Sequence, residues 1–236
     1  MANGVLIAAE ITAGGALRPI SWELVTAGRV AANALGGPLT AVVFGDGAAA
    51  RGAELAGAGV DKVLVVEDPR VHTANAEAAA SVVCAAQAAT GAGVMLLPGT
   101  TAGRDYAPKV AARLDATLAA DCIGFAADGD DLAATRSVLG GRANSVVTLS
   151  GPVQVATVRA GSFAKAEPGS GSAPVETLVV SFLPGDFRVN VTATEPKGGG
   201  ATNLDAADVV VAGGRGLKEA GNFNLVEDLA ASFGGA

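Results

Sequence analysis

The chain has 236 residues, of which 50% are hydrophobic, and a formal net charge of −7. This length fits one large α/β domain, or one domain and part of another, and the apolar content is enough to bury a sizeable core. No run of Lys or Arg offsets the acidic balance, which argues against nucleic-acid binding as a main activity.

Histidine and cysteine are too scarce to build most metal or triad sites. The chain has one histidine, His72, and two cysteines, Cys84 and Cys122, which stand far apart without metal-ligand spacing. A histidine-based triad or a multi-histidine zinc site has almost no material here, so we assign no metal site and no catalytic role to His72. We interpret both cysteines as buried apolar residues in a reducing compartment.

The N-terminal segment, MANGVLIAAE, lacks a positive region followed by a long apolar core. No segment reaches the roughly 18 uninterrupted apolar residues that a membrane span requires. We therefore expect a cytoplasmic protein without membrane insertion.

Short apolar runs alternate with longer helical patterns in the first half of the chain. The predicted strands are Val5–Ala9, Leu39–Phe44, Val63–Val66 and Gly93–Leu97. The predicted helices are Pro19–Leu35, Ala48–Ala56, about Thr73–Ala89 and about Gly103–Leu114. Because the strand runs are continuously apolar rather than alternating, they indicate a parallel sheet with crossover helices on both faces.

The pattern changes after about Asp121, where strand candidates follow one another without long helices between them. These candidates are Ala134–Leu139, Ser145–Leu149, Val153–Arg159, Val175–Phe182 and Phe187–Thr192. Turn residues such as Gly140-Gly141 and Pro184-Gly185-Asp186 separate them. This arrangement predicts antiparallel strands that extend the sheet.

A Gly-rich stretch near residue 200 predicts a domain boundary. We place an N-terminal α/β domain at residues 1–195, a linker at 196–205 and the start of a second domain at 206–236. Beyond the linker the sequence predicts a strand at Ala207–Ala212 and a helix at about Asn222–Phe233. One strand and one helix cannot enclose a core, so this tail either packs on the first domain or opens a domain of which the rest is missing.

The turn between these two elements, Gly213-Gly214-Arg215-Gly216, carries the most chemical content of the chain. Two glycines allow a sharp turn and close approach by a ligand. Arg215 supplies a planar fork of donors that suits phosphate oxygens, and the following helix supplies free N–H groups. Together they predict a site for the pyrophosphate of a dinucleotide, although a tight turn with a solvated Arg215 stays an open alternative.

The same segment resembles the start of the flavin domain in electron-transfer flavoprotein alpha subunits (the EtfA/FixB family). Two more stretches are similar to that family: residues 103–114, which match G-[KR]-[DE]-x-A-P-x-x-A-A-R-L, and residues 155–160, which match V-x-T-V-R-x. Pro19–Leu24 and Glu167-Pro168 are also similar. The resemblance covers essentially the whole chain.

This resemblance implies a redox carrier rather than a classical enzyme. It implies an adenine-nucleotide-hydrolase-like first domain that serves as a platform, and a Rossmann-like second domain that binds FAD. Arg215, with Gly213, Gly214 and Gly216, is implied to contact the FAD phosphates. The family pairs with a beta-type subunit, takes electrons from acyl-CoA or other dehydrogenases and passes them to a redox acceptor, and its FAD domain is expected to extend beyond Ala236.

Other charged residues have plainer interpretations. Arg104 and Asp105 begin a predicted helix; we favour a helix-dipole Asp and an Arg in a surface or interdomain ion pair over a ligand site at the sheet edge. Asp115 and Asp121, like the carboxylates of Asp128-Gly129-Asp130-Asp131, are compatible with acid–base chemistry or a metal. We interpret residues 128–131 as a solvated turn, since no Glu completes a calcium loop.

Two other functions stay open on the sequence. The parallel sheet of residues 1–120 is compatible with a nucleotide-binding module of the universal-stress type, although no Gly-rich phosphate loop is evident late in that domain. A structural subunit that carries no cofactor is the third possibility.

Overall fold

The computed structural model describes residues 4–71, 75–169, 171–193, 204 and 207–236. The chain divides into two compact units, Met1–Thr192 and Ala193–Ala236. Apart from Leu204, the predicted linker at 196–205 lies outside the described residues. The domain boundaries given above therefore stay a prediction.

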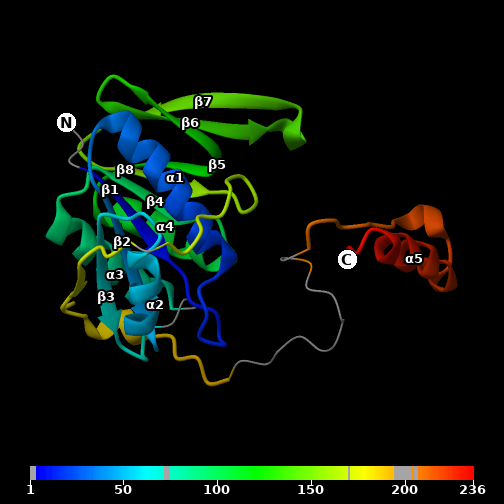
Figure 1. Ribbon diagram of the computed structural model, residues 1–236, viewed down its shortest axis with the longest axis horizontal. Coiled ribbons are helices and arrows are strands. Elements are labelled where there is room, and N and C mark those ends of the chain that lie inside the picture. Colours follow the sequence, from blue (N-terminus) through cyan, green and yellow to red (C-terminus); the bar gives the residue numbers. More distant parts are fainter. Residues whose placement is uncertain (1–3, 72–74, 170, 194–203, 205–206) are drawn as a thin grey trace. The chain divides into compact units, whose positions relative to one another are not determined.

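The first unit is built on one sheet, which has nine strands in the described residues, in the order β7-β6-β5-β8-β4-β1-β2-β3-β9. The strands are β1 Val5–Ala9, β2 Leu39–Gly45, β3 Lys62–Glu67, β4 Val94–Pro98, β5 Thr117–Asp128, β6 Asp131–Val138, β7 Ala143–Leu149, β8 Gln154–Val158 and β9 Val175–Thr177. All neighbours from β5 to β9 along this order pair in parallel, and β6 and β7 add antiparallel strands at one edge. Figure 1 shows β6 and β7 as two long strands, side by side at this edge of the sheet. The fold class predicted from the sequence is confirmed.

Helices cover both faces of the parallel region, as continuous apolar strands require. The helices of this unit are α1 Pro19–Leu35, α2 Ala48–Ala56, α3 Ala76–Thr90 and α4 Thr101–Arg113. The helices α1 and α2 pack on one face with Val5, Ile7 and Ala9, and α3 and α4 pack on the other with Leu6 and Ala8. The alternation of β1 side chains between two cores follows from the two-residue repeat of a strand.

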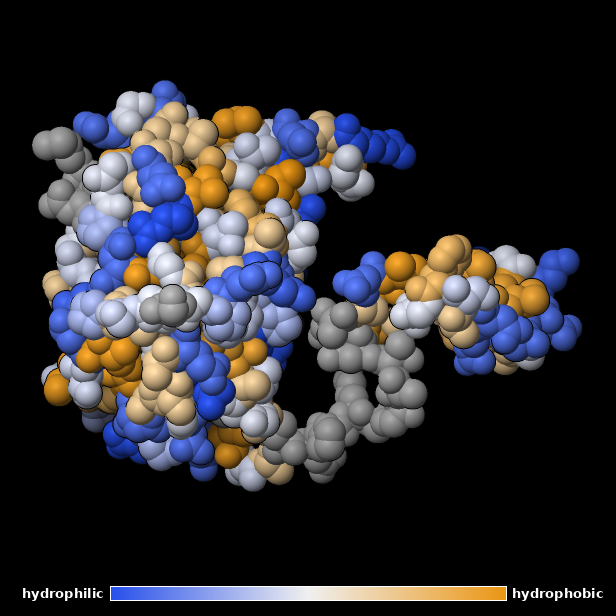
Figure 2. Space-filling view, viewed as in Figure 1, coloured by the Kyte–Doolittle hydropathy of each residue, from blue (hydrophilic) through white to orange (hydrophobic). Residues whose placement is uncertain are grey.

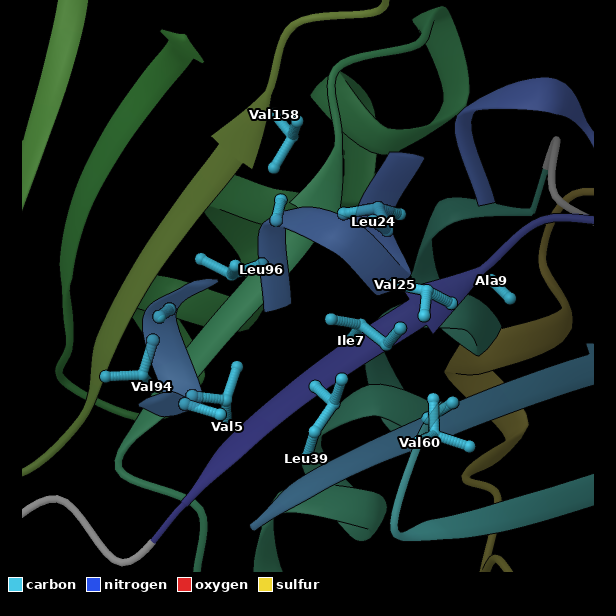
Figure 3. Close-up of a cluster of buried hydrophobic side chains, with 14 of the residues drawn as sticks. Val5, Ile7, Ala9, Leu24, Val25, Leu39, Val60, Val94, Leu96 and Val158 are labelled. Atoms are coloured by element: carbon cyan, nitrogen blue, oxygen red, sulfur yellow. The ribbon is translucent and has the colours of Figure 1, made fainter. Parts of the chain in front are cut away.

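Local sequence explains where the first helix begins and ends. Pro19 occupies its first turn, where a missing N–H costs nothing, and Gly36 ends it with a left-handed φ of 71°. Leu24 and Val25 of α1 lie over the side chains of the central strands, among them Ile7 and Leu96 (Figure 3). This packing fixes α1 across β1 and β4, whose C-terminal ends border the site described below.

Two strand predictions are wrong in part, and a third is wrong. The segment 154–158 (β8) is not antiparallel: it lies in the middle of the sheet, parallel to both β4 and β5. The predicted strand Val175–Phe182 shrinks to β9, which pairs in parallel with β3. The predicted strand Phe187–Thr192 does not form: Phe187 ends a 3-10 helix (η2, Pro184–Phe187), in which Asp186 accepts a hydrogen bond from the Leu183 amide, and residues 188–192 are irregular.

The sequence analysis also missed β5, a strand of 12 residues. Its residues are mostly half-buried or exposed, and it contains two irregularities, between Ala119 and Cys122 and between Cys122 and Gly124. These bulges interrupt any simple period of apolar residues, so the sequence pattern carries no clean strand signal.

The second unit contains two short 3-10 helices, η3 Arg215–Leu217 and η4 Ala220–Phe223, followed by α5 Asn224–Ser232. The predicted strand Ala207–Ala212 is not formed as a strand. Part of it is nevertheless extended beside Ala236, since the Ala236 amide donates to Val209 O (2.9 Å) and the Val211 amide donates to Ala236 O (2.7 Å). Hydrogen bonds from one residue to both neighbours of Val210 are the pattern of a parallel pair. Helix α5 therefore lies in the connection between two parallel segments.

Helix α5 has two apolar sides. Val226 and Ala230 are buried within the unit, whereas Leu225, Leu229 and Phe233 are exposed at four-residue spacing. Figure 2 shows hydrophobic and hydrophilic residues gathered on different sides of this unit. The residues at i and i+4 lie on one helix face, so the exposed set forms a continuous apolar stripe.

Candidate functional site

The turn of residues 213–216 is shaped by close packing behind it and open space in front of it. A Cβ at Gly213 would lie 2.5 Å from Leu217 Cδ1 and 2.8 Å from Val226 Cγ2, so this glycine lets the turn pack against η3 and α5. A Cβ at Gly214 or Gly216 would meet no atom within 4 Å. The backbone at those two positions is therefore open to a ligand.

The turn presents hydrogen-bond donors that have no acceptor among the described residues. Within the described residues, the amides of Arg215 and Gly216 donate no hydrogen bond, and no acidic side chain pairs with Arg215. The Arg215 side chain is exposed. Free amides beside a guanidinium attract an anionic oxygen, because each of these groups only donates.

The end of η3 is held firmly, which keeps the donors in place. The Leu217 amide donates to Gly214 O (3.0 Å) and the Lys218 amide to Arg215 O (3.1 Å). The Asn222 side-chain amide donates to Leu217 O (2.8 Å). Lys218 adopts a left-handed φ of 64°, a conformation that redirects the chain toward η4 and α5.

A second candidate lies in the first unit, at the C-terminal ends of β1 and β4. The chain turns from β1 to β2 on one side and from β3 back to β4 on the other, so this is the switch point where open α/β sheets bind ligands. Glu10 follows β1 and is fully buried; its Oε1 accepts a hydrogen bond from Thr100 Oγ1 (2.7 Å). Glu10 Oε2 and the hydroxyl of the fully buried Tyr106 have no hydrogen-bond partner.

The chain itself covers this switch point. The segment after β1 folds back, with a bridge between Ile11 and Leu17 and with the Arg18 amide donating to Glu10 O (2.8 Å). Burial raises the pKa of the Glu10 carboxyl, and burial raises the pKa of the Tyr106 hydroxyl well above its usual value, with the nearby Glu10 charge adding to it. Arg18 Nε lies 3.8 Å from Glu10 Oε2, so the buried carboxyl faces a cation of the chain itself, and this covered corner is a poor receptor for phosphate.

We expect Glu10→Gln to stabilise the first unit at neutral pH and to flatten the pH dependence of its stability. With the folded-state pKa raised, the parent has the full contribution of this group only below the unfolded value of about 4.5 and loses it as the pH rises through the folded pKa. Glutamine stays neutral and keeps an acceptor for Thr100. We expect a gain of about 1–3 kcal/mol at neutral pH that shrinks in acid.

Urea unfolding, followed through the fluorescence of Trp22, the single tryptophan, measures this effect across pH. Trp22 lies in α1, next to Ser21, whose hydroxyl bonds the Glu10 backbone. A Gln variant that is less stable than the parent at neutral pH, by the same amount as in acid, would contradict a buried and destabilising charge.

The described residues offer no metal centre: no group of three or more His, Cys, Asp or Glu side chains could hold an ion. Cys122 is a buried free thiol whose pKa burial raises to about 12, and burial also raises the pKa of Cys84. Thiols held in this state are poor nucleophiles. His72 lies outside the described residues.

No helix within the described residues is both long and apolar enough to cross a membrane.

Comparison with known proteins decides the family. The electron transfer flavoprotein domain model matches residues 5–183, and the electron transfer flavoprotein FAD-binding domain model matches residues 203–236. The chain is 35% identical to Protein FixB of Clostridium saccharobutylicum, over 94% of this chain and 67% of that protein. The chain belongs to the electron-transfer flavoprotein alpha (FixB) family.

Two further relatives of this family carry the alpha-subunit name. The electron transfer flavoprotein subunit alpha of Clostridium acetobutylicum is 32% identical over 99% of this chain and 71% of that protein. The subunit alpha of Bacillus subtilis is 30% identical over the whole chain and 71% of that protein. These similarities confirm the resemblance that the sequence motifs indicated.

Of the residues predicted from sequence, Gly213, Gly214, Arg215 and Gly216 lie together in one turn of the flavoprotein chain's second unit. Their assignment to FAD phosphates stays a prediction. Arg104 is confirmed in a surface ion pair, with its NH2 group 3.6 Å from Asp121 Oδ1. The sequence analysis missed the partners that Asp121 has in the folded chain, and also missed the buried Glu10–Tyr106 corner, since both depend on contacts between distant segments.

Proposed function

We propose that this chain is the alpha-type subunit of a heterodimeric electron-transfer flavoprotein. It binds FAD through the turn of residues 213–216, accepts electrons from dehydrogenases and passes them to a downstream redox acceptor. The cytoplasmic location expected from the sequence is part of this proposal. The single observation that carries it is the turn with free donors, inside the segment that the FAD-binding domain model matches.

The residues of the turn fit the phosphates of FAD. The open space before Gly214 and Gly216 admits an oxyanion to the backbone, and Arg215 offers a planar fork for two phosphate oxygens. Gly213 lets Leu217 and Val226 pack directly behind the turn. The three glycines thus shape the cradle and Arg215 supplies its charge.

When bound, FAD supplies the electron-transfer chemistry, which belongs to the cofactor and not to acid–base side chains. The chain's task is to bind the cofactor and orient it. Such a carrier needs no proton-transfer residue, which agrees with thiols whose pKa burial raises. The first unit is proposed as the platform for the beta-type subunit.

The test is to co-express the chain with a beta-type subunit, purify the complex and record its visible absorbance. We expect a yellow complex with a flavin band that is bleached by a dehydrogenase and its substrate. A stable but colourless complex would favour a structural subunit without cofactor. Tight ATP binding by the chain, with no flavin, would favour the nucleotide-binding module instead.

A further inference from the structure

The C-terminal ends of β4 and β8, and the part of β5 beside them, carry a cluster of charged residues that the proposed function does not use. Asp121 lies in β5, and Arg159 follows β8. Arg104 is in the first turns of α4, the helix that follows β4, and Arg136 lies in β6 beside β5. Parallel strands place these residues along one edge of the sheet.

Asp121 is held in a rare backbone conformation at the centre of this cluster. It has a left-handed φ of 64°, uncommon for a residue other than glycine, within the irregularity of β5 between Ala119 and Cys122. Its amide donates to Thr157 Oγ1 (2.9 Å), which pins the bulge to β8. Bulges and strained residues of this kind gather at functional sites, where they re-aim a side chain.

Two guanidinium groups lie beside this carboxylate, and a third bonds the backbone of the residue before it. Arg159 NH2 donates to Asp121 Oδ2, Arg104 NH2 lies 3.6 Å from Oδ1, and Arg136 Nε donates to Ala120 O (2.6 Å). The hydrogen bond from Arg159 lowers the pKa of Asp121, and the charges of Arg159, Arg104 and Arg136 lower it further. Asp121 is therefore ionised, and the cluster has an excess of two positive charges.

The arginines keep donors that the carboxylate does not use. Asp121 Oδ1 is buried and has no hydrogen bond, so Arg104 shields it without bonding it. The Arg104 side chain is 63% exposed and that of Arg159 is 38% exposed. Asp121 orients Arg159 and leaves the outer faces of the guanidinium groups to solvent.

The position of the cluster adds to its attraction for an anion. The N-terminal end of α4 lies at the same edge, and its dipole favours negative charge. Open α/β sheets bind ligands outside the carboxyl ends of their strands. In a chain with a net charge of −7, this cluster is a local excess of positive charge, which attracts anions to this edge of the sheet.

We infer that Arg104, Arg136 and Arg159, organised by Asp121, form a binding site for a phosphate-bearing small ligand on the first unit. Planar guanidinium forks match the oxygens of a phosphate group in pairs. These arginines belong to the first unit, whereas the turn at residues 213–216 belongs to the second.

The test is calorimetric titration with inorganic phosphate and with pyrophosphate, at constant ionic strength kept with chloride. The full chain carries Arg215→Ala in every sample, so that the turn contributes no signal. We expect R215A to bind pyrophosphate, and added R104A or R136A to weaken that binding roughly tenfold. The matched control adds R142A, an exposed arginine beyond β6, and should leave the affinity unchanged.

Equal affinities of the R104A and R142A samples would overturn the inference, as would the absence of any phosphate binding. If phosphate does not bind and R104A instead weakens association with a beta-type subunit, the arginines serve protein contact and the small-ligand site is wrong. Because all samples lack Arg215, none of these outcomes depends on whether the turn binds FAD.

Discussion

Replacing Arg215 with alanine is expected to weaken FAD binding by about 10- to 100-fold, because a hydrogen bond to a charged group contributes about 1.5–3 kcal/mol. The side chain is exposed and pairs with no acidic residue in the described part of the chain, so its loss leaves no buried group unpaired. The free energy of unfolding of the first unit should not change. The measurement is the FAD dissociation constant of the complex with a beta-type subunit, from flavin fluorescence.

Two further variants separate charge from geometry. Arg215→Lys keeps the charge but loses the planar fork, so we expect an affinity between those of the parent and the alanine variant. Arg142→Ala removes the same charge from the first unit and should bind FAD like the parent. If all three variants retain FAD equally, Arg215 does not contact the phosphates and the proposed cradle is wrong.

The first four strands and the helices between them were predictable because their signals are local. The segment 5–9 is continuously apolar, Pro19 and Gly36 mark the two ends of α1, and Gly91 ends α3 with a left-handed φ of 66°. Each signal depends on a residue's own backbone preference or on burial of both faces of a strand. The predicted and observed bounds of β1, α1 and α2 are identical.

The second half of the sheet was predicted less well, because its order depends on long-range pairing. The sequence of β8 is a buried strand in either direction, and only its hydrogen bonds to β4 and β5 make it parallel and central. In β5, the bulge around Asp121 interrupts the two-residue alternation of apolar side chains by which a strand is recognised. The segment 207–212 is apolar like a strand, but in the described residues it bonds only at Val209 and Val211, to Ala236.

The two candidate sites also differ in how well they could be predicted from the sequence. The turn at residues 213–216 is contiguous, so glycine and arginine at fixed positions could be recognised as a phosphate cradle from sequence. The arginine cluster joins residues from β6, α4 and the end of β8, and the sequence analysis considered Arg104 and Asp121 only separately. These residues lie close together only because β8 is placed between β4 and β5, and no local sequence pattern indicates that placement.

Gly103 precedes Arg104 near the start of α4. We expect Gly103→Ala to destabilise the first unit by about 3 kcal/mol or more, the second large effect. A Cβ at Gly103 would lie 1.9 Å from Pro98 O and 2.8 Å from Pro98 C. Both atoms belong to the backbone of β4, so no side-chain rotation relieves the clash. Helix α4 would have to move away from the sheet, pulling the fully buried Tyr106 and Ala107 out of their packing. Urea unfolding followed by Trp22 fluorescence measures the loss.

The same substitution at two other glycines should cost less stability, according to which atoms the added Cβ would contact. At Gly52 in α2 the nearest atom is Val65 Cγ2, at 2.6 Å, the end of a side chain that can shift, and alanine also gains helix propensity of about 1 kcal/mol. At Gly14 the nearest atom is Thr12 Oγ1, at 3.8 Å, so alanine fits without change. The loss should therefore be largest for G103A, smaller for G52A and near zero for G14A. A G103A chain as stable as G14A would mean that α4 does not approach β4 this closely, and the placement of Arg104 beside Asp121 would lose its structural basis.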